Sequence, residues 1–332
     1  MTSADSSNKY AVHNVIATLY IAMMIISIPF NFLFLSAIIT KKHLRTPTNI
    51  LVSNLAFAGL IIASFFMPFK IFELLNPNVG FPFPKSLDIC RLRAIVPVAC
   101  IFCIGLTLVT ICVDRYLVIT RSMTSSWKIS NKKAYFFLPL SWTISFVIYA
   151  QYTSYMVLYK WRDLVICIPF YPENEKNDII LGNGTDGKPS FIELSRLTFW
   201  IMHACLSFII PTILLVTLYS RIIYRLWLSQ LPIYSSSSTT LTNNVKHRLM
   251  RKKKAIKILI ACCLVFLVNN IPYFIIFIII EFRLAAVTNA SLAVQIVSII
   301  YTSAIAYNPI LYGYCNIKVR RMIFSQLSCS KP

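Results

Sequence analysis

Apolar residues dominate seven long stretches of the chain, and short polar or charged segments separate them. Each stretch holds at least the roughly 20 residues that a helix needs to cross the ~30 Å hydrocarbon core of a bilayer. Inside lipid a segment must satisfy its own backbone hydrogen bonds, so a helix is expected in every stretch. The ~10-residue alternating strands of a transmembrane β-barrel are not seen. The predicted helices span residues 15–40, 49–75, 89–120, 133–158, 192–228, 254–280 and 289–313.

This pattern predicts an all-α membrane protein, a bundle of seven transmembrane helices. The chain divides into a short polar N-terminus at 1–14, the bundle at 15–313 and a tail at 314–332. No cleavable signal peptide is visible, so the first helix is expected to serve as the membrane anchor. With 57% apolar and 13% charged residues, the chain has about half the charged share of a soluble domain. A soluble enzyme, a secreted disulfide-rich mini-protein and a disordered tail are therefore excluded.

The charges predict which way the bundle faces. The chain carries 32 basic and 11 acidic residues, which gives a net charge of +21. With the N-terminus outside, most basic residues fall in the inner loops, where Asp114 is the one acid. The positive-inside rule then predicts a multi-pass plasma-membrane protein with an extracellular N-terminus. Because the basic residues lie in short loops beside helices, we expect contact with anionic membrane lipids and no binding of nucleic acid.

Two of the ten cysteines differ from the rest in their expected surroundings. Cys90 lies at the outer start of the third helix and Cys167 in the loop after the fourth, so both face an oxidising compartment. We expect one disulfide between them, which holds a long outer loop over a cavity. Cys329 in the tail is a candidate for lipidation, although an unmodified thiol fits as well. Asn183 and Asn289 begin glycosylation sequons on the outer side.

The inner ends of two helices carry short polar motifs. Asp114-Arg115-Tyr116 closes the third helix, and a motif from Asn308-Pro309 to Tyr312 closes the seventh. Pro211 and Pro272 interrupt the fifth and sixth helices, and such kinks let half of a helix swing. A transporter is expected to show internal repeats and ionisable groups near the mid-plane. The chain shows no detectable repeat and almost no charge inside its helices, which favours a receptor.

In these motifs the chain resembles a rhodopsin-like (class A) G-protein-coupled receptor from end to end. The resemblance implies a heterotrimeric G protein as partner, no enzymatic activity, and a short amphipathic eighth helix within 314–332 on the inner leaflet. It also implies that Asp114 holds Arg115 at rest, and that on activation Arg115 moves toward Tyr219 while Tyr312 moves inward. The matching residues are Asn31, Leu55, Ala56, Cys90, Asp114, Arg115, Tyr116, Trp142, Pro211, Tyr219, Phe266, Pro272, Asn308, Pro309 and Tyr312.

Within this class the chain looks most like opsins of the melanopsin kind, on Leu44-Arg45-Thr46-Pro47 and on Tyr273 after the helix-six proline. However, Thr302 occupies the position of the lysine to which opsins attach retinal, and a hydroxyl cannot form an imine. Asn270 replaces the tryptophan that packs on retinal. Arg93 stands where many opsins carry an acid or a tyrosine facing the Schiff base. The chain therefore resembles a lysine-less opsin relative, a placopsin, and no cofactor is expected.

Two further departures concern the middle and the inner end of the bundle. Gly59 occupies the position of the helix-two aspartate with which receptors of this class hold sodium, and its expected partners are Ile104 and Ala304. These residues offer too few oxygen ligands for a hard cation, so we expect an apolar core and no metal. Opsins also tie the helix-three arginine to a helix-six glutamate, and that position is Lys252. Only the aspartate of the Asp-Arg-Tyr motif is then expected to restrain this arginine.

The expected ligand site is the outer cavity bounded by helices three, five, six and seven. Adjacent buried amides are costly unless paired, so Asn269 and Asn270 either bind a polar ligand or water, or bond each other and helix seven. Arg93 either binds an anionic ligand group or extends to the membrane edge. The candidate lining residues are Arg93, Pro97, Asn269, Asn270, Tyr273 and Thr302.

Three functions remain open on the sequence alone. The first is a receptor that activates a G protein on binding a non-covalent extracellular ligand, whose identity the sequence does not give. The second is a photoreceptor that holds retinal without the usual lysine. The third is a non-signalling opsin relative.

Overall fold

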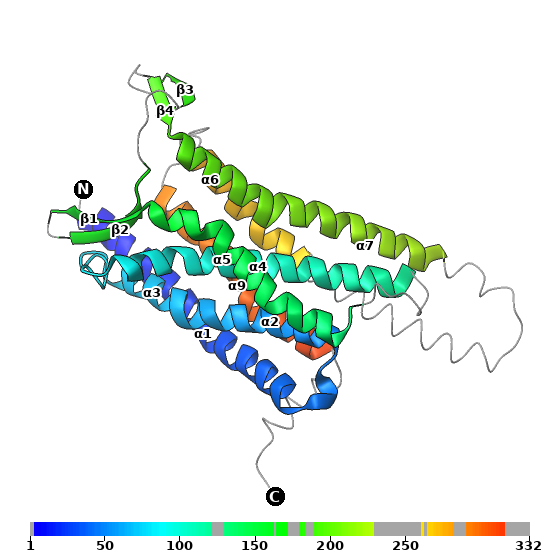
Figure 1. Ribbon diagram of the computed structural model, residues 1–332. Coiled ribbons are helices and arrows are strands. Elements are labelled where there is room, and N and C mark those ends of the chain that lie inside the picture. The colour runs from blue at the N-terminus through cyan, green and yellow to red at the C-terminus, as the bar shows by residue number, and fades with distance from the viewer. Residues whose placement is uncertain are drawn as a thin grey trace, which may run out of the picture.

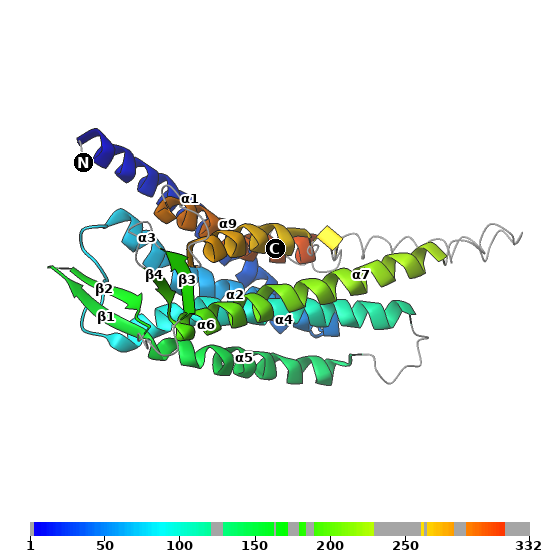
Figure 2. The same ribbon diagram turned by 90° about the horizontal axis from the view of Figure 1, so that it is seen from above.

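The structure is a computed structural model, and it describes residues 3–120, 129–162, 164–171, 179–183, 189–228, 260–261, 264–281 and 290–315. Its long helices run along a common direction and form a bundle (Figure 1 and Figure 2). Within these residues, six helical stretches are long and apolar enough to cross a membrane, and a shorter apolar helix at Ala290–Ala306 makes the seventh. The predicted all-α bundle of seven helices is confirmed.

The helices follow the predicted stretches, with differences at two ends. The first helix starts at Ser3, so the segment expected to be a polar N-terminus is helical; adding turns to an existing helix costs little. The fourth helix ends at Ser154 instead of at 158, because a strand begins at Met156. The helices are α1 (Ser3–Thr40), α2 (Pro47–Ile61), α3 (Met67–Leu75), α4 (Leu87–Thr120), α5 (Asn131–Ser154), α6 (Leu194–Ala204), α7 (Ile210–Leu228), the helix Leu264–Glu281 and α9 (Ala290–Cys315).

Two π-helical turns interrupt the second and fifth membrane helices. The turn η2 (Ile62–Phe66) joins α2 to α3, and η3 (Cys205–Ile209) joins α6 to α7. A proline, Pro68 or Pro211, stands two residues after each turn. Proline has no N–H to donate and its ring crowds the carbonyl four residues earlier, so the helix widens just before it. The irregularity expected at Pro211 is therefore a π turn.

The segment after α5 was expected to be a loop, and it contains two antiparallel hairpins. Strand β1 (Met156–Trp161) pairs with β2 (Leu164–Pro169), and β3 (Ile179–Asn183) pairs with β4 (Pro189–Ile192). Both hairpins lie at the end of the bundle where α4 begins (Figure 1). Pairing the strands satisfies backbone N–H and C=O groups that an irregular loop would have to satisfy in other ways.

A disulfide and a close backbone contact hold the first hairpin on the bundle. Cys167 in β2 is bonded to Cys90 at the start of α4, which confirms the predicted pair. The backbone N–H of Phe81 donates to the carbonyl of Val165 in β2 at 2.6 Å. Gly80 has a φ of +78°, and a Cβ there would lie 2.6 Å from the same carbonyl, so glycine is required. We call this end of the bundle the disulfide end and the opposite one the Arg115 end.

Some predictions lie outside the described residues. They concern the amphipathic helix after residue 315, Cys329, Asn289 and Lys252. For Asn183, in β3, only the backbone is described.

A buried amide ties three helices together in the middle of the bundle. Nδ2 of Asn54, in α2, donates to the hydroxyl of Thr107 in α4 at 2.9 Å. Oδ1 of the same side chain accepts from Nε1 of Trp142 in α5 at 2.8 Å. Asn54 is 2% exposed. Because lipid offers no hydrogen-bond partners, these groups must pair with one another, and that pairing fixes how α2, α4 and α5 meet.

Replacing Asn54 with alanine should lower the stability of the purified protein. The change removes the acceptor of the N–H group of the half-buried Trp142, and we expect a loss of about 1–3 kcal/mol in the free energy of unfolding. Ser53→Ala is the matched control, since Ser53 donates to the carbonyl of Asn49 in its own helix. Melting curves of both variants measure the difference. An Asn54→Ala melting temperature equal to that of the control would contradict this account.

Candidate functional site

At the Arg115 end, two neighbours hold the arginine of the Asp-Arg-Tyr motif. Its Nη2 lies 3.5 Å from Oδ2 of Asp114, the expected partner. It also donates to the hydroxyl of Thr48, and that hydroxyl donates to Asp114 Oδ2 at 3.4 Å. Thr48 lies in the first turn of α2. The expectation that the aspartate alone restrains this arginine is thereby corrected, because α2 supplies a second partner.

Other residues that match the motifs of rhodopsin-like receptors lie on the expected helices. Tyr116 is half-buried near the end of α4. Tyr219 in α7 and Phe266 in the helix Leu264–Glu281 are buried, and Pro272 lies further along the latter helix. These positions agree with the roles that the resemblance implies, and those roles remain predictions.

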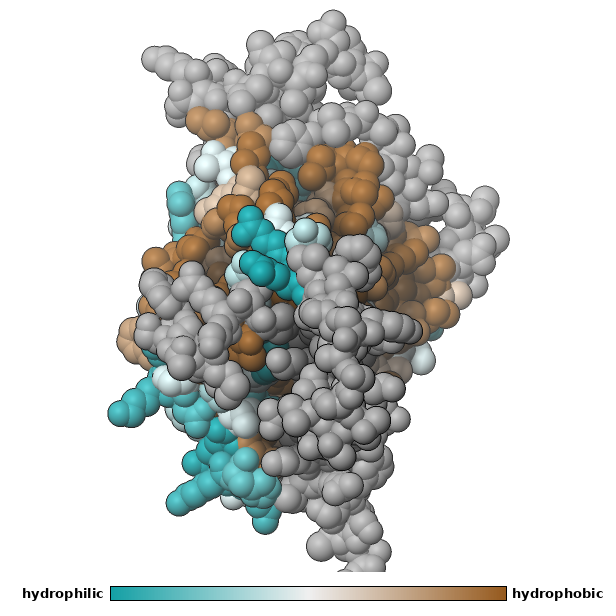
Figure 3. All heavy atoms as spheres, turned by 90° about the vertical axis from the view of Figure 1, so that its right-hand side faces the viewer, coloured by the Kyte–Doolittle hydropathy of each residue, from teal (hydrophilic) through white to brown (hydrophobic). Residues whose placement is uncertain are grey.

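The motif at the end of α9 is described only in part. Asn308 is 3% exposed, while only the backbone of Pro309 and Tyr312 is described. Figure 3 looks onto this end of the molecule and shows hydrophilic residues gathered on parts of the end face, with hydrophobic residues along the flanks. That distribution suits helices whose sides face lipid and whose ends face water.

At the position that lacks the helix-two aspartate, a neighbouring amide fills the space. A Cβ at Gly59 would lie 3.0 Å from Oδ1 of Asn31. Nδ2 of Asn31 donates to the carbonyls of Ser27 at 2.7 Å and of Ile305 at 3.1 Å. The amide of α1 therefore packs against both α2 and α9. Among the residues that the structure describes, no group of three His, Cys, Asp or Glu side chains is arranged to hold a metal ion.

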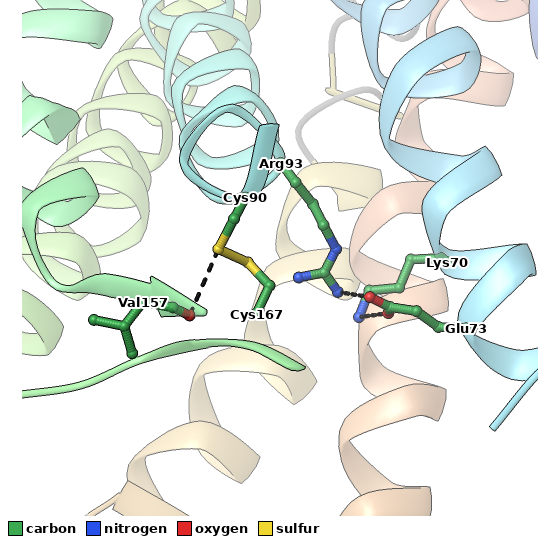
Figure 4. Close-up of polar contacts among 6 residues, drawn as sticks. All are labelled: Lys70, Glu73, Cys90, Arg93, Val157 and Cys167. Atoms are coloured by element: carbon green, nitrogen blue, oxygen red, sulfur yellow. Dashed lines mark hydrogen bonds and ion pairs between the residues drawn. A yellow bond between two sulfur atoms is a disulfide. The ribbon is translucent and has the colours of Figure 1, made fainter. Parts of the chain in front are cut away.

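At the disulfide end, three charged side chains from two helices meet. Glu73 of α3 lies between Lys70, whose Nζ is 3.6 Å from Oε2, and Arg93 of α4, whose guanidinium contacts Oε1 (Figure 4). Arg93 stands one helical turn after Cys90, so the disulfide fixes the helix end that carries it. We call Lys70, Glu73 and Arg93 the basic cluster, because it holds two cations and one carboxylate.

A second charged group, with the opposite balance, lies where α6 begins and the helix Leu264–Glu281 ends. Arg196 Nε is 3.1 Å from Glu193, and its Nη1 is 3.6 Å from Glu281. The guanidinium also lies over the ring of Tyr171, 5.1 Å from the centroid. Burial, together with the neighbouring Tyr152 and Glu281, raises the pKa of Tyr171 well above its ordinary range, so its hydroxyl stays protonated. We call Glu193, Arg196 and Glu281 the acidic cluster.

The predicted pocket residues, apart from Arg93, are buried. Pro97 lies within α4, and the Thr302 hydroxyl donates to the carbonyl of Ser298 at 2.8 Å. Nδ2 of Asn270 donates to the carbonyl of Phe266, 2.7 Å away in the same helix. Asn270 therefore uses its N–H group within its own helix instead of bonding Asn269 or helix seven. Oδ1 of Asn270 and Nδ2 of Asn269 have no hydrogen-bond partner in the part of the chain that the structure describes.

Tyr273 belongs to an aromatic cluster formed by α6, the helix Leu264–Glu281 and α9. Its ring stacks on Tyr301 of α9 with centroids 3.9 Å apart. His203 is 1% exposed. Its Nδ1 and the hydroxyl of Tyr149 share a hydrogen bond of 2.8 Å. Sequence reasoning missed His203, because one histidine in an apolar stretch carries no pattern. The cluster consists of Phe199, Trp200, His203, Tyr273, Phe274, Phe277 and Tyr301.

Comparison with known sequences decides the family. The profile described as 7 transmembrane receptor (rhodopsin family) matches residues 30–312. The chain belongs to this family. The resemblance to rhodopsin-like receptors is thereby confirmed, and the family is one of receptors, not of enzymes.

The receptor is also similar to curated peptide receptors. The QRFP-like peptide receptor of Branchiostoma floridae is 24% identical over 313 residues, which cover 93% of this chain and 76% of the relative. Neuropeptide receptor 22 of Caenorhabditis elegans is 27% identical over 252 residues, which cover 74% of this chain and 55% of the relative. Tachykinin-like peptides receptor 99D of Drosophila melanogaster is 24% identical over 320 residues, which cover 92% of this chain and 56% of the relative. The receptor thus spans about three quarters of the first relative and little more than half of the other two.

These relatives do not support the opsin-like subtype. The residues behind that expectation, Leu44-Arg45-Thr46-Pro47 and Tyr273, are short motifs. The similarity to peptide receptors extends over most of the chain in all three comparisons.

The receptor's stability should not depend on sodium. Gly59 supplies no carboxylate, and the Asn31 amide occupies the adjacent space. Replacing sodium with potassium at constant ionic strength should leave the melting temperature of the purified receptor unchanged. Choline serves as a second, non-coordinating control. A sodium-specific rise in melting temperature would show that Asn308 and water still assemble a site.

Proposed function

We propose that this receptor binds an extracellular peptide at its disulfide end and activates a heterotrimeric G protein at its Arg115 end. One observation carries the proposal: α4 bears a lid disulfide and a charged, partly exposed residue at one end, and a restrained arginine at the other. Cys90 and Arg93 stand at its start, Asp114 and Arg115 near its finish. Signalling across a membrane requires two distinct sites that are coupled, and α4 connects these two.

The charges support this orientation. The loops at the Arg115 end are rich in Lys and Arg, and the positive-inside rule assigns such loops to the cytoplasm. The disulfide end is then extracellular, where Cys90 and Cys167 form their bond in an oxidising compartment. The plasma membrane follows as the location, with the N-terminus outside.

A peptide ligand is supported by the relatives and by the form of the disulfide end. Two of the relatives are named as receptors of peptides, and a third as a neuropeptide receptor. Partly exposed charges at this end include two clusters on different helices, while Thr302, Asn270 and Tyr273 are buried inside the bundle. A ligand that contacts both clusters needs several polar groups spread along its length, as a peptide has. We propose that it binds without a covalent bond, because Thr302 offers no amine.

Activation of a G protein by peptides tests the proposal. The receptor is expressed in cells with a G-protein biosensor and exposed to a panel of QRFP-like peptides, tachykinin-like peptides and other neuropeptides. At least one class should produce a concentration-dependent signal that cells expressing Arg115→Ala do not give, with surface expression of the variant matched to that of the wild type. Failure of the whole panel, with the receptor on the surface, would contradict a ligand of these kinds.

Removing the Thr48 hydroxyl should raise signalling without ligand. Thr48→Val keeps the shape of the side chain but removes the group that accepts from Arg115 and donates to Asp114. A shift of ~1 kcal/mol changes a two-state ratio about fivefold, and basal G-protein activation should rise by about that factor. Thr40→Val is the matched control, since the Thr40 hydroxyl donates to the Ser36 carbonyl within its own helix. Equal basal activity of the two variants would show that packing elsewhere sets the resting state.

A further inference from the structure

The basic cluster holds more positive charge than its one carboxylate can balance. Glu73 offers two oxygens, and one faces Lys70 while the other contacts Arg93. A lysine has three N–H donors and an arginine five, so most of their donors are not used by this acid. Nε of Arg93 is buried and has no hydrogen-bond partner within the described residues. The cluster thus combines a net positive charge with an unsatisfied buried donor.

The cluster can be reached from the disulfide end. The side chains of Lys70 and Glu73 are 33% and 29% exposed, and that of Arg93 is 14% exposed. Figure 4 shows all three beside the Cys90–Cys167 disulfide, with Glu73 reaching between the two cations. Partial burial strengthens the attraction of these cations for an anion, because there is less water to screen them than at a fully exposed site.

The acidic cluster shows that a net positive charge is not common to the whole disulfide end. There, Arg196 faces two carboxylates, Glu193 and Glu281, so the balance is negative. Tyr152 of α5 lies within electrostatic reach of both Arg93 and Glu281. An anionic group that approaches the disulfide end is attracted toward α3 and α4 and repelled from the ends of α6 and the helix Leu264–Glu281.

We infer that Lys70 and Arg93 form a subsite for a carboxylate of the ligand, either the free C-terminus of a peptide or an Asp or Glu side chain. This inference rests on the proposed peptide-receptor function. A carboxylate accepts hydrogen bonds from Lys70 Nζ and from the guanidinium of Arg93, including the unsatisfied Nε, while Glu73 keeps the two cations in place. Hydrogen bonds between ions of opposite charge are the strong class, and the guanidinium fork matches the two oxygens of a carboxylate.

Thermal stability without ligand separates this role from a structural one. If Lys70 serves the ligand, Lys70→Gln leaves the Arg93–Glu73 pair intact, and the melting temperature of the empty receptor stays at the wild-type value. Glu73→Gln leaves two cations together without an acid, so this variant has a lower melting temperature. A loss in Lys70→Gln as large as that in Glu73→Gln would overturn the inference, since Lys70 would then be holding the helices together.

Binding is tested with random hexapeptide libraries on the purified receptor in nanodiscs. One library has a free C-terminal carboxylate and the other a C-terminal amide, which separates the two sources of the carboxylate. Lys85→Gln is the matched control, because it removes the same charge from an exposed lysine of the α3–α4 loop. Wild type and Lys85→Gln should enrich carboxylate-bearing peptides, through the free terminus in the first library or through Asp and Glu in the second. Lys70→Gln should bind the selected peptides about tenfold more weakly.

Each result decides a separate claim. Enrichment of peptides with no preference for a carboxylate, or an equal loss in Lys85→Gln, would overturn the subsite and leave the peptide receptor standing. If no peptide is enriched, the peptide function fails, and hexanoate is compared with hexanamide in a thermal-shift assay. Stabilisation by hexanoate alone, absent in Lys70→Gln, supports the carboxylate subsite even then, and equal behaviour of the two compounds overturns it.

Discussion

A hydrocarbon environment offers no hydrogen-bond partners, and this constraint organises the whole structure. Several buried polar groups in the bundle find partners on neighbouring helices. The Asn54 amide joins α2 to α4 and α5, and the Asn31 amide joins α1 to α9. Unpaired polar atoms cost free energy in such surroundings, so these contacts select one arrangement of helices over others of similar apolar packing. The charges are confined to the two ends, where water replaces lipid.

Helix α4 runs from one end of the bundle to the other, and contacts fix it at both ends and in the middle. The parts that can change shape are the irregular ones: the π turn before Pro211 and the helix that contains Pro272. The contact between Arg196 and Glu281 joins the outer ends of these two elements. A ligand that alters this contact acts on the membrane helix that carries Tyr219, toward which Arg115 is expected to move, and in this way a local electrostatic change can reach the other side of the membrane.

The sequence predicted the seven helices because long apolar runs need no tertiary information, and the disulfide because topology left two cysteines outside. It could not show that Thr48 reaches Arg115, since the two residues meet only when α2 packs on α4. Lys70, Glu73 and Arg93 likewise lie on two helices, and only Arg93 stood out beforehand. The hairpins were missed because their strands lack a clear alternation. The opsin-like subtype rested on short motifs, which the longer similarity to peptide receptors outweighs.

The central claim is that a peptide at the disulfide end and a G protein at the Arg115 end bind the receptor cooperatively. Thermodynamic linkage makes this measurable at equilibrium, because each partner must change the other's affinity by the same factor. The most direct measurement is the affinity of an activating peptide for receptor in nanodiscs, with and without nucleotide-free G protein. The account predicts tighter peptide binding with the G protein and a return to the lower affinity when guanine nucleotide is added. A peptide affinity that is the same under all three conditions would contradict it.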